Sequence, residues 1–109
     1  MSFQEVAKVM DVVPGTMKSF AVGDKQLLIV NVSGTFYAMD GICTHAGGDL
    51  SKGKLEGTVV TCPRHGSRFD VTTAKSLSGP KFGFVTLKTR DEKAYEVKTE
   101  GGRIMVNLP

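Results

Sequence analysis

Apolar and polar residues alternate along three early segments of the chain. The alternation covers residues 16–21, 26–32 and 35–39, and a period of two is typical of β-strands that bury one face. Two short turn sequences, Gly23-Asp24 and Ser33-Gly34, separate these segments and suit tight hairpins. We therefore expect three consecutive antiparallel strands.

The rest of the chain alternates strand-like segments with glycine-rich connections. Residues 40–57 contain five glycines and no sustained period, which indicates a loop with room for one short helical turn. A turn is also expected at 76–81, and further strands are expected at 58–61, 68–71, 82–89, 94–99 and 103–108. Because no segment has a sustained helical period, the sequence predicts an all-β fold with a single domain over residues 1–109.

The composition is that of an ordinary globular domain. Apolar residues make up 40% of the 109 residues and charged residues 23%. The formal net charge is +3, with basic and acidic residues interleaved along the chain. Since there is neither a basic run nor a helix to carry a basic stripe, we expect no nucleic-acid partner.

Neither a secretion signal nor a membrane span is expected. The N-terminal segment contains Glu5, Lys8 and Asp11, so it lacks the apolar core of a signal peptide. The longest aliphatic run, at 27–30, is far too short to cross a bilayer. We therefore expect a cytoplasmic protein, in which cysteines bind metals or act in catalysis more often than they form disulfides.

Every cysteine and histidine of the chain lies in one of two short motifs, Cys43-x-His45 and Cys62-x-x-His65. Thiolate and imidazole are the side chains that suit borderline-soft transition metals. Sixteen residues separate the motifs, enough to run out along a strand pair and return. The glycines around the motifs allow the backbone to approach a metal centre closely; they are Gly41, Gly47, Gly48 and Gly66.

Other uses of these residues explain less of the pattern. Unconnected core or surface residues would leave the duplicated pairing to chance. A disulfide between Cys43 and Cys62 leaves both histidines without a role, and a thiol nucleophile with a histidine base requires no second pair. Zinc and an iron–sulfur cluster both fit two cysteines and two histidines. Because each motif mixes the two types, the spacing favours a binuclear cluster with both thiolates on one iron and both imidazoles on the other.

The motifs C-T-H-A-G-G and C-P-R-H-G-S-R-F-D resemble the Rieske 2Fe–2S signature, C-x-H followed by C-x-x-H. The resemblance covers nearly the whole chain and includes four shorter matches to Rieske-type ferredoxins, at Pro14-Gly15, Tyr37-Ala38, Ser78-Gly79-Pro80 and Glu100-Gly101-Gly102. It implies three antiparallel sheets, with a small cluster-binding subdomain at about 41–81 on a base domain formed by the remainder. It also implies one 2Fe–2S cluster per chain, with Cys43, His45, Cys62 and His65 as its ligands.

Two departures from the family pattern indicate a soluble ferredoxin of low potential. High-potential members join their ligand loops by a disulfide, and the matching positions here are Gly48 and Arg64. Those members also bond cluster sulfur through a serine and a tyrosine; Ser67 keeps the first hydroxyl, whereas Phe69 has lost the second. Fewer such bonds stabilise the reduced cluster less, so we expect a potential in the lower part of the Rieske range of about −150 to +300 mV. Three further residues are expected around the cluster: Gly47, Gly66 and Pro80.

The resemblance implies an electron carrier and not an enzyme. The chain would take single electrons from a flavin-dependent reductase and pass them to a terminal oxygenase or a similar acceptor. Two alternatives stay open: a Rieske-like small subunit of a larger reductase such as nitrite reductase, and a structural zinc module.

Four basic residues lie in or near the second motif and in the segment between the motifs: Lys52, Lys54, Arg64 and Arg68. They are either ordinary solvated charges or a basic rim that steers an acidic partner.

Overall fold

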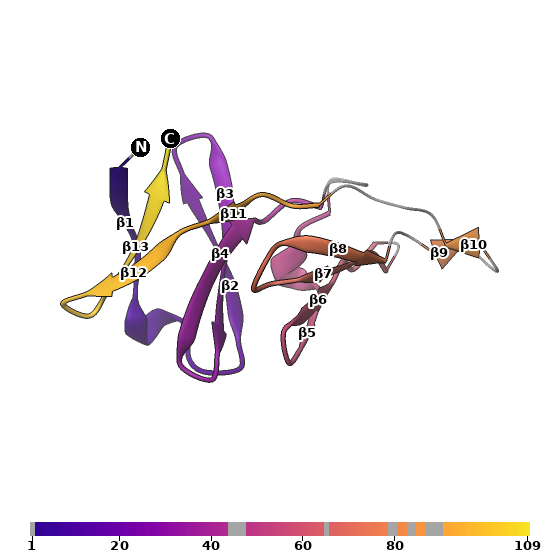
Figure 1. Ribbon diagram of the computed structural model, residues 1–109, viewed down its shortest axis with the longest axis horizontal. Helices are drawn as coiled ribbons and strands as arrows, with labels where there is room; N and C mark the ends of the chain where they lie inside the picture. Colours follow the sequence, from indigo (N-terminus) through magenta and orange to yellow (C-terminus); the bar gives the residue numbers. More distant parts are fainter. Residues whose placement is uncertain (1, 44–47, 65, 79–80, 83–84, 87–90) are drawn as a thin grey trace.

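The computed structural model describes residues 2–43, 48–64, 66–78, 81–82, 85–86 and 91–109, and these residues form antiparallel strands with two short 3₁₀ turns (Figure 1). The first half contains β1 (Ser2–Lys8), η1 (Val9–Asp11), β2 (Met17–Val22), β3 (Lys25–Val32), β4 (Thr35–Asp40) and η2 (Leu50–Lys52). Next come β5 (Lys54–Glu56), β6 (Val59–Thr61), β7 (Arg68–Asp70), β8 (Lys75–Ser78), β9 (Lys81–Phe82) and β10 (Val85–Thr86). The last strands are β11 (Ala94–Tyr95), β12 (Val97–Glu100) and β13 (Arg103–Leu108).

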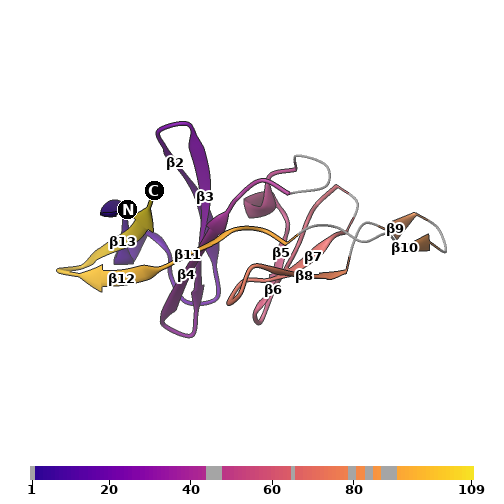
Figure 2. The ribbon, with the colours of Figure 1, turned by 45° about the horizontal axis from the view of Figure 1, so that its top comes forward.

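Three antiparallel sheets carry most of these strands. Their strand orders are β1-β13-β12, β11-β4-β3-β2 and β5-β6-β7-β8. Figure 1 shows the second sheet between the other two. A small ribbon, β9 with β10, extends past the end of the third sheet, as the two views in Figures 1 and 2 agree. The all-β class and the three sheets expected from the sequence are confirmed.

Strand β3 is buried on both faces, which explains its unbroken apolar run at 27–30. Leu27 and Ile29 belong to the core that includes Ile104 of β13. Leu28 and Val30 belong to a second core, which includes Phe69 of β7. Successive side chains of a strand point to opposite faces, so this one strand supplies both cores. Each such side chain contributes roughly 1.5–3 kcal/mol by leaving water.

The sequence predicted the meander of β2, β3 and β4 and the last strand well, but it missed several elements. Strands β1 and β5 fall in segments for which no strand was expected. The turn expected at 76–81 is wrong in its first part, because β8 pairs there with β7 through Phe69 opposite Ser76. The connection between the two strands, residues 71–74, contains no Gly, Pro, Asn or Asp, and Ala74 takes the positive φ that such residues usually supply. Leu77 is half exposed, so no buried alternation marks the strand either.

Two further expectations concern the organisation of the chain. The proposed boundary of a cluster-binding subdomain at about 41–81 stays a prediction; strands β5 to β8 lie within it. In the part of the chain that the structure describes, no helix is long and apolar enough to span a membrane.

Asn31 of β3 fastens the segment before β2 to the β3–β4 hairpin. Its buried side chain donates from Nδ2 to the carbonyl oxygen of Val12 (2.8 Å) and accepts at Oδ1 from the N–H of Gly34 (2.8 Å). Asn31→Ala leaves both backbone groups without these partners, so we expect a loss of about 2–3 kcal/mol in the free energy of unfolding, measured by chemical denaturation.

Asn107→Ala is the matched control for this prediction. The Asn107 amide donates to the exposed carboxylate of Glu96 at 3.2 Å, so its replacement is expected to cost less than about 1 kcal/mol. Equal losses of unfolding free energy in the two variants would show that the buried hydrogen bonds of Asn31 contribute no more than the exposed one of Asn107.

Candidate metal centre

Both cysteines begin loops that close with the same backbone hydrogen bond. The N–H of Cys43 donates to the carbonyl oxygen of Gly48 (2.8 Å), and the N–H of Cys62 donates to that of Ser67 (2.7 Å). Each bond spans five residues, so the two loops are equivalent in this respect although their sequences differ. By sequence, His45 lies inside the first loop and His65 inside the second.

The histidines themselves lie outside the described residues, as do Gly47 and Pro80. Among the described residues, no three side chains of the types His, Cys, Asp and Glu come together to form a metal site. The four-ligand set of Cys43, His45, Cys62 and His65 therefore stays a prediction. Of these four residues, the structure describes the positions of the two cysteines.

Cys43 and Cys62 belong to one buried cluster of side chains. Their exposed fractions are 3% and 2%, and they do not form a disulfide. Phe69 and Leu50 belong to the same cluster and are fully buried. An apolar surrounding excludes water from bound metal and limits the hydrogen bonds that reach the sulfur ligands.

Ser67 provides a test of whether the residues fit a cluster. Its side chain is 1% exposed, and its Oγ has no hydrogen-bond partner among the described residues. Burying a hydroxyl without a partner costs about 1–3 kcal/mol, so the site calls for an acceptor that the described residues do not supply. A cluster sulfur beside Cys62 is such an acceptor. The buried Phe69, two residues further on, has no hydroxyl to offer.

The first loop is fixed at both of its ends. Before it, Tyr95 of β11 donates from Oη to the Asp40 carboxylate (2.6 Å). Burial, together with this hydrogen bond, raises the pKa of Tyr95 well above its usual value, so the phenol remains a donor at ordinary pH. At the far end, the N–H of Leu50 donates to the carbonyl oxygen of Gly41 (2.9 Å). The start and the return of this loop are therefore held together.

Two glycines allow the segment after the first loop to contact the second loop. A Cβ at Gly48 would lie 3.0 Å from the Sγ of Cys62 and 3.2 Å from the Cγ of Arg64. A Cβ at Gly53 would collide with the carbonyl oxygen of Thr61, the residue before Cys62. The absence of side chains at both positions is therefore what brings the loops into contact.

Sequence reasoning selected Gly48 and Arg64 as facing positions, but it missed Gly53 and the bond between Tyr95 and Asp40. The latter joins residues 55 positions apart, for which no local signal exists. A third omission was detectable: Asp49 accepts from the N–H and Oγ of Ser51 (3.0 and 2.7 Å) and caps η2. The pattern Asp-x-Ser before a short turn is a known capping signal.

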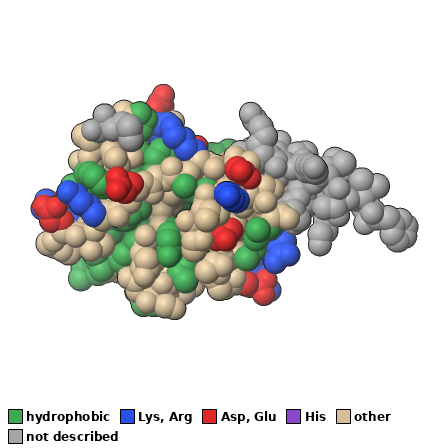
Figure 3. Space-filling view, in the orientation of Figure 1, with side chains coloured by type: hydrophobic (Ala, Val, Ile, Leu, Met, Phe, Trp, Pro, Cys, Tyr) green, Lys and Arg blue, Asp and Glu red, His purple; other side chains and the backbone are tan. Residues whose placement is uncertain are grey.

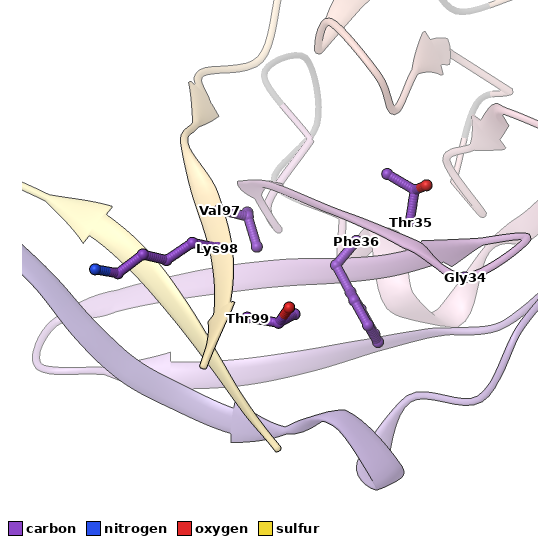
Figure 4. Close-up of a pocket in the computed structure, with 6 residues that line it drawn as sticks. All are labelled: Gly34, Thr35, Phe36, Val97, Lys98 and Thr99. Carbon is purple, nitrogen blue, oxygen red and sulfur yellow. The ribbon is translucent and has the colours of Figure 1, made fainter. Parts of the chain in front are cut away.

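A hollow of about 310 Å³ lies away from both loops, between β4 and β12 (Figure 4). It forms where β11 ends its short pairing with β4 and the chain leaves to pair with β13. Lys98 points away from Phe36 in this view, and its Nζ lies 4.5 Å from the ring centroid of Phe3. The lining contains no cysteine, histidine or carboxylate, so it holds none of the predicted ligands and no carboxylate base.

The contact between Gly48 and Arg64 can be tested with a double cysteine variant. A Cβ at Gly48 would lie within 3.2 Å of Arg64 Cγ, so the two Cβ positions are within reach of a disulfide. We expect Gly48→Cys/Arg64→Cys to form an intramolecular disulfide between positions 48 and 64, detected by peptide mass spectrometry without reduction.

Gly57→Cys/Arg64→Cys serves as the control, because nothing lies within 4 Å of a Cβ at Gly57. Equal bridging in both variants, or none in the first, would contradict the placement of Gly48 against Arg64.

Comparison with known proteins gives a consistent assignment. The family model described as Rieske [2Fe-2S] domain matches residues 2–103. The ferredoxin component of the naphthalene 1,2-dioxygenase system of Pseudomonas putida is 38% identical over 104 residues, which cover 95% of this chain and 93% of that protein. The ferredoxin component of biphenyl 2,3-dioxygenase of Rhodococcus jostii strain RHA1 is 36% identical over 108 residues, 99% of this chain and 94% of that protein.

Solved structures agree with the sequence comparisons. The ferredoxin of carbazole 1,9a-dioxygenase from Nocardioides aromaticivorans IC177 superposes with a TM-score of 0.84 at 26% identity, and each chain is covered completely. A chain from the complex of reduced oxygenase and oxidized ferredoxin in carbazole 1,9a-dioxygenase gives 0.82 at 33% identity, over 95% of this chain and 100% of that one. This protein belongs to the Rieske [2Fe-2S] domain family and resembles its ferredoxins over the whole chain.

Proposed function

We propose that this ferredoxin carries single electrons from a flavoprotein reductase to the terminal oxygenase of an aromatic-ring dioxygenase system. The observation that carries the proposal is the alignment with the ferredoxin components of naphthalene and biphenyl dioxygenases, which covers nearly all of this chain and nearly all of each relative. A ferredoxin of the family has also been solved together with its oxygenase. A chain that matches separate ferredoxins from end to end is itself expected to act as a carrier and not as an enzyme.

The residues of the two loops would divide the work of holding the cluster. Cys43 and Cys62 would bind one iron, and His45 and His65 would bind the other, which is the division that the mixed motifs favour. When bound, the 2Fe–2S cluster takes up and releases one electron. The apolar cluster of side chains around the cysteines keeps water from the sulfur ligands, and the hydroxyl of Ser67 donates a hydrogen bond to sulfur.

The proposal includes a cytoplasmic location. Its support is the chemistry of the cysteines, which serve as metal ligands in a reducing compartment more often than as a disulfide. Fractionation of the producing cells, with the ferredoxin followed by its visible absorption, would test the location.

The cluster and its ligands are tested by composition and spectroscopy. We expect iron and inorganic sulfide in equal amounts, as in the 2Fe–2S description of the family. After reduction with dithionite, we expect the electron paramagnetic resonance signal of a cluster with mixed cysteine and histidine ligation. Single replacements His45→Ala and His65→Ala should each remove this signal, whereas Asn107→Ala should retain it.

Zinc without sulfide would refute the electron-carrier function, and an intact signal in either histidine variant would refute that ligand.

Ser67→Ala tests how the polypeptide sets the potential. A hydrogen bond to cluster sulfur stabilises the reduced, more negative cluster, so its loss should lower the reduction potential. For a bond that favours the reduced state by about 1.4 kcal/mol, the expected fall is about 60 mV for one electron. Protein-film voltammetry measures this change, and Ser2→Ala, at an exposed position of β1 in the sheet β1-β13-β12, is the control that should leave the potential unchanged.

A potential of Ser67→Ala equal to the wild-type value would show that the buried hydroxyl finds another acceptor.

A further inference from the structure

In the third sheet, the strand register places basic and acidic side chains of the outward face in different rows. Lys54 lies opposite Thr61, and Thr61 lies opposite Arg68, so these three residues form one row across β5, β6 and β7. Directly opposed residues share a face of the sheet. The neighbouring row, which contains Val60 and Phe69, points into the core. Lys54 and Arg68 therefore point outward, beside the strand end that leads into Cys62.

Arg64 adds a positive charge at the contact between the two loops. A Cβ at Gly48 would lie 3.2 and 3.3 Å from Cγ and Cδ of Arg64, and 3.0 Å from Sγ of Cys62. The aliphatic part of Arg64 thus lies over Gly48, close to the sulfur. Arg64 is exposed as a residue, as expected when a long side chain packs its stem and keeps its charged group in water.

Lys52 lies beside the same row. It is the last residue of η2 and is exposed. The next residue, Gly53, is in close contact with the backbone of Thr61. Lys52, Lys54, Arg64 and Arg68, here called the basic rim, therefore gather around the ends of the two loops.

The acidic residues of the same region lie further from the loops or accept hydrogen bonds within the chain. Asp49, directly after Gly48, accepts from the N–H and Oγ of Ser51 (3.0 and 2.7 Å). Glu56 and Asp70 belong to the next outward row, two residues further from the loops along the strands, with Val59 between them. Asp70 accepts from the N–H and Oγ1 of Thr72 (2.9 and 2.7 Å). The exposed pair of Lys54 with Glu56, at 3.9 Å, contributes little. Figure 3 shows both charge types over the region of β5 to β8, but the register places the positive ones nearer the loops.

We propose that the basic rim docks an acidic surface of the redox partner. This inference rests on the proposed function, because only an electron carrier has to bring its cluster close to a partner's centre. Complementary charges around a docking surface accelerate encounter and suppress wrong partners. The partner is therefore a protein with an acidic patch around its own electron entry or exit point.

Two small inorganic oxidants report the charge at the site where the electron leaves. Hexacyanoferrate(III) is a trianion, and tris(phenanthroline)cobalt(III) is a trication. Each takes one electron from the reduced ferredoxin, so that iron(III) becomes iron(II) or cobalt(III) becomes cobalt(II). Stopped-flow rates are measured from about 0.02 to about 0.5 M ionic strength, which shortens the Debye length from roughly 20 Å to roughly 4 Å. We expect oxidation by the anion to slow with added salt, and oxidation by the cation not to slow.

The test variant neutralises three rim residues and keeps Arg64, because Arg64 contacts the metal site. Lys52→Gln/Lys54→Gln/Arg68→Gln should slow oxidation by the anion about tenfold at low salt and converge with the wild-type rate at high salt. The control Lys8→Gln/Lys18→Gln/Lys98→Gln changes the net charge equally, on β1, β2 and β12, and should have a much smaller effect. Potentials of all three proteins are measured so that rates are compared at equal driving force.

Equal effects of the two triple variants, or rates that do not respond to salt, would overturn the basic rim. Submicromolar binding of a labelled DNA duplex to the wild type at about 0.15 M salt would also overturn it, in favour of a nucleic-acid surface. Loss of the proposed function is distinguishable, because a protein without the mixed-ligand resonance signal would give no electron to either oxidant.

Discussion

Burial of β3 on both faces is the constraint on which the rest of the structure depends. One face of the strand packs toward β13 and the other toward β7, so a single unbroken apolar run joins the base sheets to the sheet that carries the second loop. The core on the second side contains both cysteines. The two cysteines of the predicted metal site are therefore part of a hydrophobic core, and they are held by the same packing that stabilises the domain.

Close approach of the two loops follows from this packing, but it also requires that two side chains be absent. Gly48 and Gly53 bring the segment after the first loop onto Cys62 and onto the backbone of Thr61. In both loops, a bond from the cysteine N–H to the fifth residue onward closes the turn. The same hydrogen bond in both loops fits the predicted binuclear cluster, since each loop would supply one ligand to each iron.

The sequence predicted the fold class and the central meander, because local alternation and two-residue turns mark β2, β3 and β4 directly. It also indicated a metal site at the two motifs, since cysteines and histidines seldom fall into a duplicated spacing by chance; the ligand set stays a prediction. It did not predict β8 or the bond between Tyr95 and Asp40. The turn that joins β7 to β8, residues 71–74, contains no Gly, Pro, Asn or Asp and instead places Ala74 at a positive φ. The bond between Tyr95 and Asp40 joins distant segments, for which a single sequence contains no local signal. Gly53 was likewise counted only as a loop residue, because its role depends on its contact with the backbone of Thr61.

Two features of the site act on the potential in opposite directions. With a cluster bound at the cysteines, the cation of Arg64 near Cys62 would favour the reduced state and so raise the potential, whereas Phe69 lacks a hydroxyl that would do the same. Arg64 is exposed, and interactions of exposed charges are screened by water and salt to about 1 kcal/mol or less. A hydrogen bond to a charged acceptor in a buried site is worth about 1.5–3 kcal/mol. We therefore expect the missing hydroxyl to outweigh the cation and the potential to lie in the lower part of the Rieske range.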